Sequence, residues 1–276
     1  MFNNEPRNIG SMVGISSSVK FLLILNVVIF ALDALTSQRL LTENFALRAN
    51  WWMNFEIGQL FTYMFIHGSL SHLMVNMLGL FFIGPTVERT IGAFRFFILY
   101  YVSGILGGLG WSLIADPFPV ADAFGNTFMH YPICVGASGA VMGILGAFGA
   151  LYPNAKLLLW FVIPCRAWML VLGLAIWELH ETISEPLIGG IANAAHLIGG
   201  VAGFSYAISL KHPHLVDEFK ARIPGLGKKK PRPSNAPRAE QLSKEDVDRI
   251  LDKIGKEGMG ALTPREREML KRATRG

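Results

Sequence analysis

Charged residues are scarce in this sequence. Asp, Glu, Lys and Arg together make up 16% of its 276 residues, whereas a soluble domain contains about 25%. Hydrophobic residues reach 51%, and the mean hydropathy is +0.39. This composition excludes an ordinary soluble domain and indicates a polytopic membrane protein.

Cysteine is nearly absent. The two residues present, Cys134 and Cys165, cannot form a disulfide framework, and no Cys-x-x-Cys spacing occurs. The His-Glu-x-x-His sequence of many zinc proteases is absent as well. We therefore expect neither a metal nor another cofactor.

A cleavable signal peptide is not expected either, because residues 1–19 are polar and no small-residue cleavage site follows a short apolar core.

Long apolar runs are abundant, and six of them fit membrane-spanning helices. They cover residues 19–36, 69–87, 92–115, 135–152, 166–179 and 194–210. The fifth run is short, and one broken span over 157–179 is an alternative that gives the same total. The predicted fold class is therefore an all-α polytopic membrane protein.

Basic residues are distributed unevenly between the loops. With the N-terminus in the cytoplasm, the outer loops at 116–132 and 180–193 contain no Lys or Arg, and the first outer loop contains two. The inner segments before the tail carry Arg7, Lys20, Arg89, Arg95, Lys156 and Arg166. By the positive-inside rule, this asymmetry predicts that both termini are cytoplasmic.

The composition changes after residue 210. Residues 1–210 contain 8 Lys/Arg and 10 Asp/Glu, whereas 211–276 contain 17 and 10. We predict a cytoplasmic N-terminal segment, a membrane domain, a basic Pro-rich linker and a small helical extension, at 1–18, 19–210, 211–239 and 240–276.

Two short helical patterns occur in the extension. Ser243 can cap the first, and Thr263-Pro264-Arg265-Glu266 resembles a capping box that begins the second. The extension is interpreted as a helical hairpin that docks onto a partner surface, or as a solvated tail attracted to anionic lipid. It contains no recognisable nucleic-acid-binding module, so no nucleic-acid partner is expected.

Few polar groups fall within the apolar spans, and such groups are functional candidates because they are costly at membrane depth. Ser138 lies at the outer end of the fourth span between Gly136 and Gly139, where by itself it suits a helix-packing role. His196 lies near the outer end of the sixth span. The second span brings three further groups to its outer end: His67, His72 and Asn76. The predicted topology places all of them at a similar depth on one side.

Together these groups suit acyl transfer. A serine hydroxyl is a weak nucleophile that needs a neighbouring base, and His196 is the best candidate to activate Ser138. The amide of Asn76, a ring N–H of His72 and the backbone N–H of Ser138 could stabilise an oxyanion. Gly199 and Gly203 would let the sixth helix approach the fourth closely.

A Ser-His dyad is expected because no acidic residue is placed at this depth. Three glutamates lie at the loop end: Glu178, Glu181 and Glu185. Haem or metal binding is disfavoured, since His67 and His72 point to different helix faces, although buried histidines can also simply bond to carbonyl groups. A transporter would need a polar pathway through the bilayer, whereas polar groups occur only in the outer half.

At these residues the sequence resembles the rhomboid family of intramembrane serine proteases over roughly 51–210. Three separated motifs carry the resemblance. His67, His72 and Asn76 resemble the His-x4-His-x3-Asn pattern of the family's second helix. Gly136-Ala137-Ser138-Gly139 resembles its nucleophile motif, and Ala195-His196 with Gly199 and Gly203 resembles its base motif.

The resemblance implies a six-helix bundle with a water-filled, outward-facing cavity that cleaves transmembrane segments, and a small soluble helical tail lies outside this core. Ser138 is then the nucleophile and His196 the base, while His72 and Asn76 assist the oxyanion. His67 would hold the second helix and first loop in place. The fifth helix and the third outer loop would form a gate and cap over the site.

Two positions depart from the family pattern. Gly58-Gln59 replaces a common Trp-Arg pair, so the docking of the first outer loop is open. Met142 replaces a common aromatic residue one turn after Ser138, which predicts altered packing on His196. In the first loop, Trp51, Trp52, Met53 and Phe55 fit either a headgroup-embedded segment or a plain aromatic belt.

We expect a serine endopeptidase that cuts membrane proteins near the outer surface of a bacterial cytoplasmic (inner) membrane. Its expected partners are transmembrane protein substrates and the lipid bilayer. The alternative is a catalytically silent relative that binds or escorts membrane proteins. The sequence does not define the oligomeric state or the substrate.

Overall fold

The computed structural model describes residues 14–36, 39–122, 124–159, 162–184, 190–222 and 244–273. The chain divides into two compact units, Met1–Phe219 and Lys220–Gly276. The predicted cap at Ser243, the N-terminal segment before residue 14 and the linker residues 223–243 lie outside the described residues. The predicted domain boundaries therefore stay predictions.

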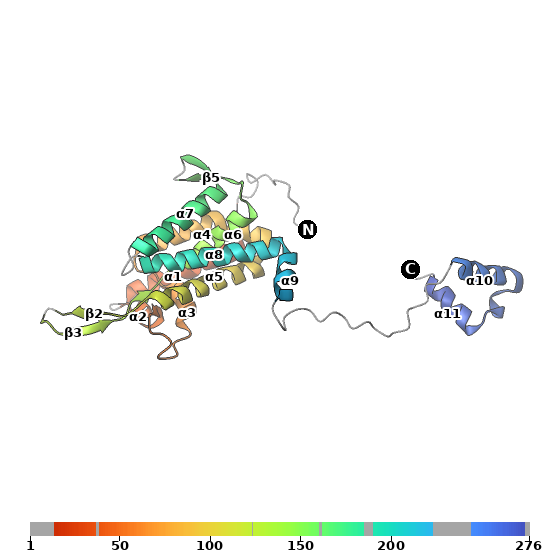
Figure 1. The fold of residues 1–276 in the computed structure, drawn as a ribbon, viewed down its shortest axis with the longest axis horizontal. Helices are drawn as coiled ribbons and strands as arrows, with labels where there is room; N and C mark the ends of the chain where they lie inside the picture. Colours follow the sequence, from red (N-terminus) through yellow and green to blue (C-terminus); the bar gives the residue numbers. More distant parts are fainter. Residues whose placement is uncertain are drawn as a thin grey trace. The chain divides into compact units, whose positions relative to one another are not determined.

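A helix occupies each of the apolar segments of the first unit (Figure 1). These helices are α1 (Ser17–Leu35), α4 (Leu70–Ile91), α5 (Ala93–Ile114), α6 (Ser138–Leu151), α7 (Ala167–Ser184) and α8 (Gly190–Lys211). Among the described residues, α1, α4 and α5 are long and apolar enough to cross a membrane, and α6 is a shorter apolar helix. The first unit is thus a mostly helical membrane protein.

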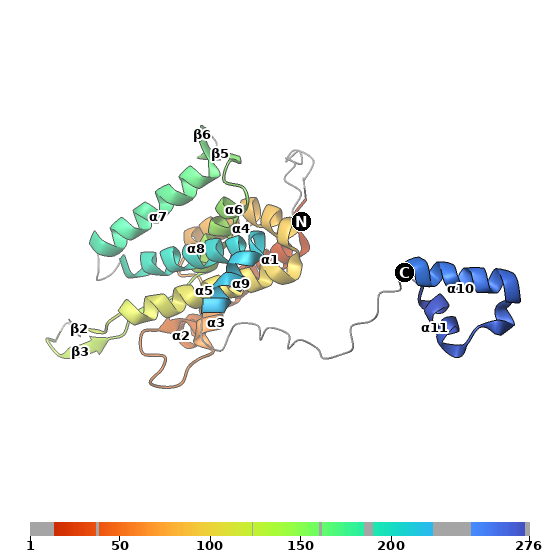
Figure 2. The same ribbon diagram turned by 45° about the vertical axis from the view of Figure 1, so that its right-hand side comes forward.

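Helices α6 and α8 form the most extensive helix pair, and α5 packs against both. Figures 1 and 2 show α8 between α5 and α7. The close contact of α6 with α8 depends on glycine. A Cβ atom on Gly199 would overlap the carbonyl oxygen of Gly139, and one on Gly203 would overlap that of Gly143. The predicted close approach of the sixth helix to the fourth is therefore present in the structure.

The N-terminus of α1 is held by a side chain from α4. The Glu88 carboxylate accepts hydrogen bonds from the Ser18 N–H at 3.1 Å, the Ser18 hydroxyl at 2.8 Å and the Val19 N–H at 3.1 Å. The Ser16 hydroxyl donates to it as well. A carboxylate is well placed here because a helix N-terminus carries unpaired N–H groups and a partial positive charge. This contact joins the first two long helices.

In the described part of the chain, three short antiparallel strand pairs lie in segments that the all-α prediction left without strands. Strand β1 (Leu47–Arg48) pairs with β4 (Ile133–Cys134), β2 (Phe118–Ala121) with β3 (Thr127–His130), and β5 (Lys156–Leu159) with β6 (Ile163–Arg166). The β2–β3 hairpin projects beyond the helices (Figure 1). The broken helical span over 157–179 is wrong, because β5 and β6 occupy its first part and Pro164 cannot continue a helix there.

Shorter elements lie between and after these helices, and the last of them crosses the boundary between the two units. Between α1 and α4 lie α2 (Leu40–Phe45), α3 (Gln59–Thr62) and the 3-10 turn η2 (Tyr63–Phe65), and α9 (Pro213–Arg222) follows α8. The core is apolar and continuous from α1 through α8. Its largest fully buried side chains include Tyr63, Phe96, Tyr100, Leu22 and Met64.

The second unit is a helical hairpin. It consists of α10 (Lys244–Glu257), the 3-10 turn η3 (Met259–Ala261) and α11 (Pro264–Ala273). Ile250 and Leu262 form its small core, with 2% and 4% of each residue exposed. The predicted capping box is present: the Glu266 carboxylate accepts from the Thr263 N–H at 2.7 Å, and the Glu266 N–H donates to the Thr263 hydroxyl at 3.3 Å.

Candidate active site

Ser138 is the first residue of α6, directly after a sharp turn. Gly136 makes the turn with φ +116°, a backbone conformation that side-chain-bearing residues rarely adopt. Its N–H donates to the Tyr63 carbonyl at 2.9 Å, which fixes the turn against η2. As the first helical residue, Ser138 has a backbone N–H without an intrahelical partner. The hydroxyl therefore lies at the N-terminus of a helix, beside the first N–H groups of α6.

His196 of α8 lies next to this hydroxyl. Its Nε2 atom is 2.7 Å from Ser138 Oγ, within hydrogen-bonding distance. The glycine contacts between α6 and α8 make this separation possible, because bulkier residues at 199 and 203 would push the helices apart. The structure thus brings together the predicted nucleophile and base in the arrangement expected of an activated serine.

A third side chain, Glu178 of α7, completes a chain of contacts. Its Oε1 atom is 3.1 Å from Nδ1 of His196, and 9% of the residue is exposed. The expectation that no acidic residue lies at this depth was wrong. Glu178 lies six residues before the end of α7, and His196 lies six residues after the start of α8. At 1.5 Å per residue, two antiparallel helices bring such positions to the same level. The apolar runs of the sequence, which end at 179 and resume at 194, did not show this correspondence.

His72 and Asn76 of α4 face the turn before Ser138. A Cβ atom on Gly136 would lie 2.6 Å from His72 Nε2 and 3.8 Å from Asn76 Nδ2. Asn76 is buried, with 4% of the residue exposed, and its Nδ2 donates to the His72 carbonyl at 3.0 Å. Both predicted oxyanion residues therefore lie against the nucleophile segment.

His67 is also buried and links the segment before α4 to the turn before α6. Its Nε2 accepts a long hydrogen bond of 3.5 Å from the Ala137 N–H. Its ring lies edge to face with the ring of His72, with centroids 5.2 Å apart. His67 thus supports two parts of the site, the strand-to-helix turn and His72.

The loop between α1 and α4 is held onto the same region without a Trp-Arg pair. Gln59 is buried; its Oε1 accepts from the Arg48 N–H at 3.0 Å and its Nε2 donates to Glu56 at 2.9 Å. Strand β1, which contains Arg48, pairs with β4, and β4 ends two residues before Gly136. The side chain that replaces the usual pair therefore fixes the loop by hydrogen bonds.

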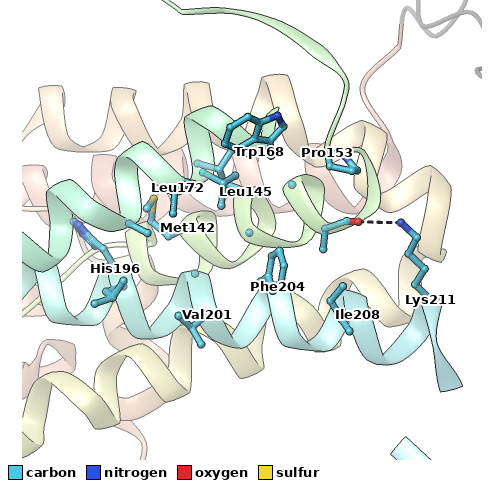
Figure 3. Close-up of a pocket in the computed structure, with 17 residues that line it drawn as sticks. Met142, Leu145, Pro153, Trp168, Leu172, His196, Val201, Phe204, Ile208 and Lys211 are labelled. Carbon is cyan, nitrogen blue, oxygen red and sulfur yellow. Dashed lines mark hydrogen bonds between the residues drawn. The ribbon is translucent and has the colours of Figure 1, made fainter. Parts of the chain in front are cut away.

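An apolar groove of about 570 Å³ leads away from His196 between α6, α7 and α8. Figure 3 shows His196 and Met142 at one end and Lys211 at the other. Lys211 Nζ donates to the Ala150 carbonyl at 3.3 Å. Met142 thus lies at the His196 end of the groove, where the sequence predicts altered packing on the histidine.

Among the described residues, no group of three or more His, Cys, Asp or Glu side chains could hold a metal ion. Cys134 and Cys165 are both free thiols. The side chains that do converge are a hydroxyl, an imidazole and a carboxylate, which is the set used for activated-serine chemistry.

Comparison with known proteins gives two family matches. Residues 51–213 match the Rhomboid domain model, and residues 235–275 match a family of unknown function (DUF6576). The second match coincides with the helical hairpin of the second unit and assigns it no activity.

Curated relatives carry rhomboid names. Rhomboid protein 1, mitochondrial, of Saccharomyces cerevisiae is 36% identical over 143 residues, 51% of this chain and 38% of the relative. RHOMBOID-like protein 12, mitochondrial, of Arabidopsis thaliana is 32% identical over 198 residues, which are 67% of this chain and 56% of the relative. Rhomboid protease AarA of Providencia stuartii is 29% identical over 191 residues, which are 66% of this chain and 62% of the relative. The matched part is thus less than two thirds of each of these relatives.

The family model covers more than half of the chain and contains every side chain brought together around Ser138. Some relatives are named as proteases and others only as rhomboid-like proteins. From the matched domain, the relatives and the apolar helices, the chain is an integral membrane protein that belongs to the rhomboid family.

Proposed function

We propose that this protein is a serine endopeptidase that cleaves transmembrane segments of membrane proteins. The observation that carries the proposal is the separation of 2.7 Å between Ser138 Oγ and His196 Nε2. That contact gives the serine a base within reach, which acyl transfer requires. The protease names of several relatives support the same activity.

In the proposed reaction, Ser138 Oγ attacks the substrate carbonyl and its proton passes to His196 Nε2. The resulting imidazolium gives this proton to the leaving amine as the peptide C–N bond breaks, leaving an acyl-enzyme. Water then attacks the ester while Nε2 takes its proton, and that proton returns to Ser138 Oγ as the acid product leaves.

The tetrahedral intermediates carry a negative oxygen that needs hydrogen-bond donors. The backbone N–H of Ser138 at the start of α6 is one donor in this proposal. His72 and Asn76, which face Gly136, are the side-chain donors. His67 keeps the turn before Ser138 and the ring of His72 in place.

The proposed setting is a bilayer crossed by all six helices, with both termini in the cytoplasm. The uneven distribution of Lys and Arg supports this orientation, and a bacterial cytoplasmic membrane is the proposed location. The site then lies towards the outer surface. Its substrates would be transmembrane proteins that reach it from the bilayer.

The test compares wild type, Ser138→Ala and His196→Ala on a transmembrane reporter in liposomes. We expect both variants to lose at least about a thousandfold in cleavage rate, because neither half of the pair works alone. A fluorophosphonate probe should label wild type on Ser138 and leave Ser138→Ala unlabelled. Cleavage by both variants at the wild-type rate would refute the proposal.

Matched controls are available in the same membrane unit. Ser112→Ala removes a buried hydroxyl of α5 that bonds to the Leu109 carbonyl, and His130→Ala removes an exposed histidine of β3. Both should cleave like wild type. A folded wild type that neither cleaves nor labels would favour the alternative, a catalytically silent relative that binds membrane proteins.

A further inference from the structure

Glu178 is a buried carboxylate within a helix of the membrane unit. Its Oε1 contacts His196 Nδ1 at 3.1 Å. Its Oε2 is buried and has no hydrogen-bond partner in the described part of the chain. A hydrogen bond from the Thr182 hydroxyl ends on the backbone carbonyl of Glu178 and leaves the side chain untouched. Among the described residues, the Glu178 carboxylate therefore forms its hydrogen bond with the imidazole of His196.

This contact selects one form of the imidazole. An ionised carboxylate accepts hydrogen bonds and donates none, so the neutral ring must carry its proton on Nδ1. Nε2 then presents a lone pair to the Ser138 hydroxyl at 2.7 Å. In the other tautomer, Nε2 would carry a hydrogen and could not take the serine proton. The geometry around His196 is thus the one in which it acts as a base.

The same contact lowers the free energy needed to form the positively charged imidazolium of His196. When the proton moves from Ser138 Oγ to Nε2, the imidazole becomes positive 3.1 Å from the Glu178 carboxylate. In this step the proton stays on the imidazole and is not passed on to Glu178. Because a charge in a poorly hydrated site costs desolvation free energy, a carboxylate placed there is stabilised by a partner that becomes cationic.

We propose that Glu178 is a positioning residue that holds His196 in the Nδ1–H form and stabilises its imidazolium. The inference rests on the proposed function, and it extends the Ser-His dyad to a relay of three side chains on α6, α8 and α7. It also gives α7 a direct part in the chemistry, because any displacement of this helix from α8 would separate the carboxylate from the ring.

Kinetics on the transmembrane reporter in liposomes provide the first test, with full-length Glu178→Gln, Glu178→Ala and Glu178→Asp. The isosteric Gln variant should lower kcat by about tenfold or more and the Ala variant by about a hundredfold, because Glu178 supports only part of the roughly 100- to 10,000-fold that general base catalysis contributes. KM should stay within about twofold, since Glu178 touches no substrate in this proposal. The Asp variant should recover part of the loss.

Glu181→Gln is the matched control. It makes the same change three residues along α7, where the carboxylate pairs at 3.5 Å with the exposed His180. It should keep the wild-type kcat. Thermal melting of each variant shows whether α7 has stayed folded.

Nitrogen NMR of the histidine rings provides a second test that needs no turnover. At mildly alkaline pH, ¹⁵N-labelled wild type should show His196, assigned by its loss in His196→Ala, as the Nδ1–H form. Glu178→Ala should shift it towards the Nε2–H form. A wild-type kcat in Glu178→Gln and Glu178→Ala would overturn the inference, and so would a lower kcat with an unchanged tautomer.

Failure of the proposed function gives a different result. If folded wild type neither cleaves nor labels, the protease proposal falls, and the NMR result alone then decides the role of Glu178. Loss of the Nδ1–H form in Glu178→Ala would support the positioning role, and its persistence would overturn it.

Discussion

Gly136 is the residue whose replacement should most directly disturb the geometry around Ser138. Its φ of +116° is strained for a residue with a side chain, and an added Cβ would lie 2.6 Å from two ring atoms of His72. We expect Gly136→Ala to destabilise the protein by about 1–3 kcal/mol and to slow fluorophosphonate labelling of Ser138 by at least about tenfold. Thermal melting and labelling rates measure the two effects.

Gly58→Ala is the matched control for this change. Gly58 has a negative φ of −58°, and an added Cβ there would meet nothing within 4 Å. It should melt and label like wild type. If Gly136→Ala labels as fast as this control, the turn does not set the position of Ser138.

The sequence predicted the paired Ser138 and His196 but missed Glu178. Motif spacing and predicted depth were enough for the first two, because each lies near one end of a clearly apolar segment. The apolar run of the fifth segment ends at residue 179, where polar residues begin, whereas hydrogen bonding continues α7 to Ser184. Glu178 was therefore assigned to the end of a helix that in fact continues past it.

At the scale of elements, the sequence predicted helices well and strands poorly. Apolar runs of helical length signal helices whether or not their neighbours are known. The strands among the described residues contain two to four residues each, too few for an alternating pattern to show. The pairing of β1 with β4 depends on residues far apart in the chain, so a local pattern could not reveal it.

The capping box of α11 predicts an acid-sensitive helix. Hydrogen bonds from the Thr263 N–H and hydroxyl, followed by Lys253, lower the pKa of Glu266 from an ordinary 4.5 to about 2. The folded hairpin thus gains stability from the ionised carboxylate above pH about 4.5 and loses it progressively as the pH falls towards about 2. We expect circular dichroism of a peptide covering 240–276 to lose helix content in this window.

Glu266→Gln should remove most of this acid dependence, because an amide does not titrate. Glu257→Gln, at the end of α10, is the control and should keep the wild-type acid transition. An acid transition in Glu266→Gln as large as that of wild type would show that other carboxylates control the hairpin.

At the scale of the whole molecule, the family matches follow the division into units. The Rhomboid domain match ends at residue 213, and the match to the family of unknown function begins at residue 235. The side chains gathered around Ser138 come from residues 67 to 196, all within the first unit. The composition changes after residue 210, but a basic composition alone does not define what the second unit does.

This separation predicts that the second unit is dispensable for the chemistry at Ser138. A chain ended after Arg222 keeps α9 and every site residue. We expect its fluorophosphonate labelling rate to match that of the full chain within about twofold, because the side chains gathered around Ser138 and the Rhomboid domain match all lie before residue 222. Ser138→Ala in the shortened chain sets the background. A rate at least about tenfold lower, with unchanged thermal melting, would instead show that the hairpin acts on the membrane unit, a coupling of about 1.4 kcal/mol or more.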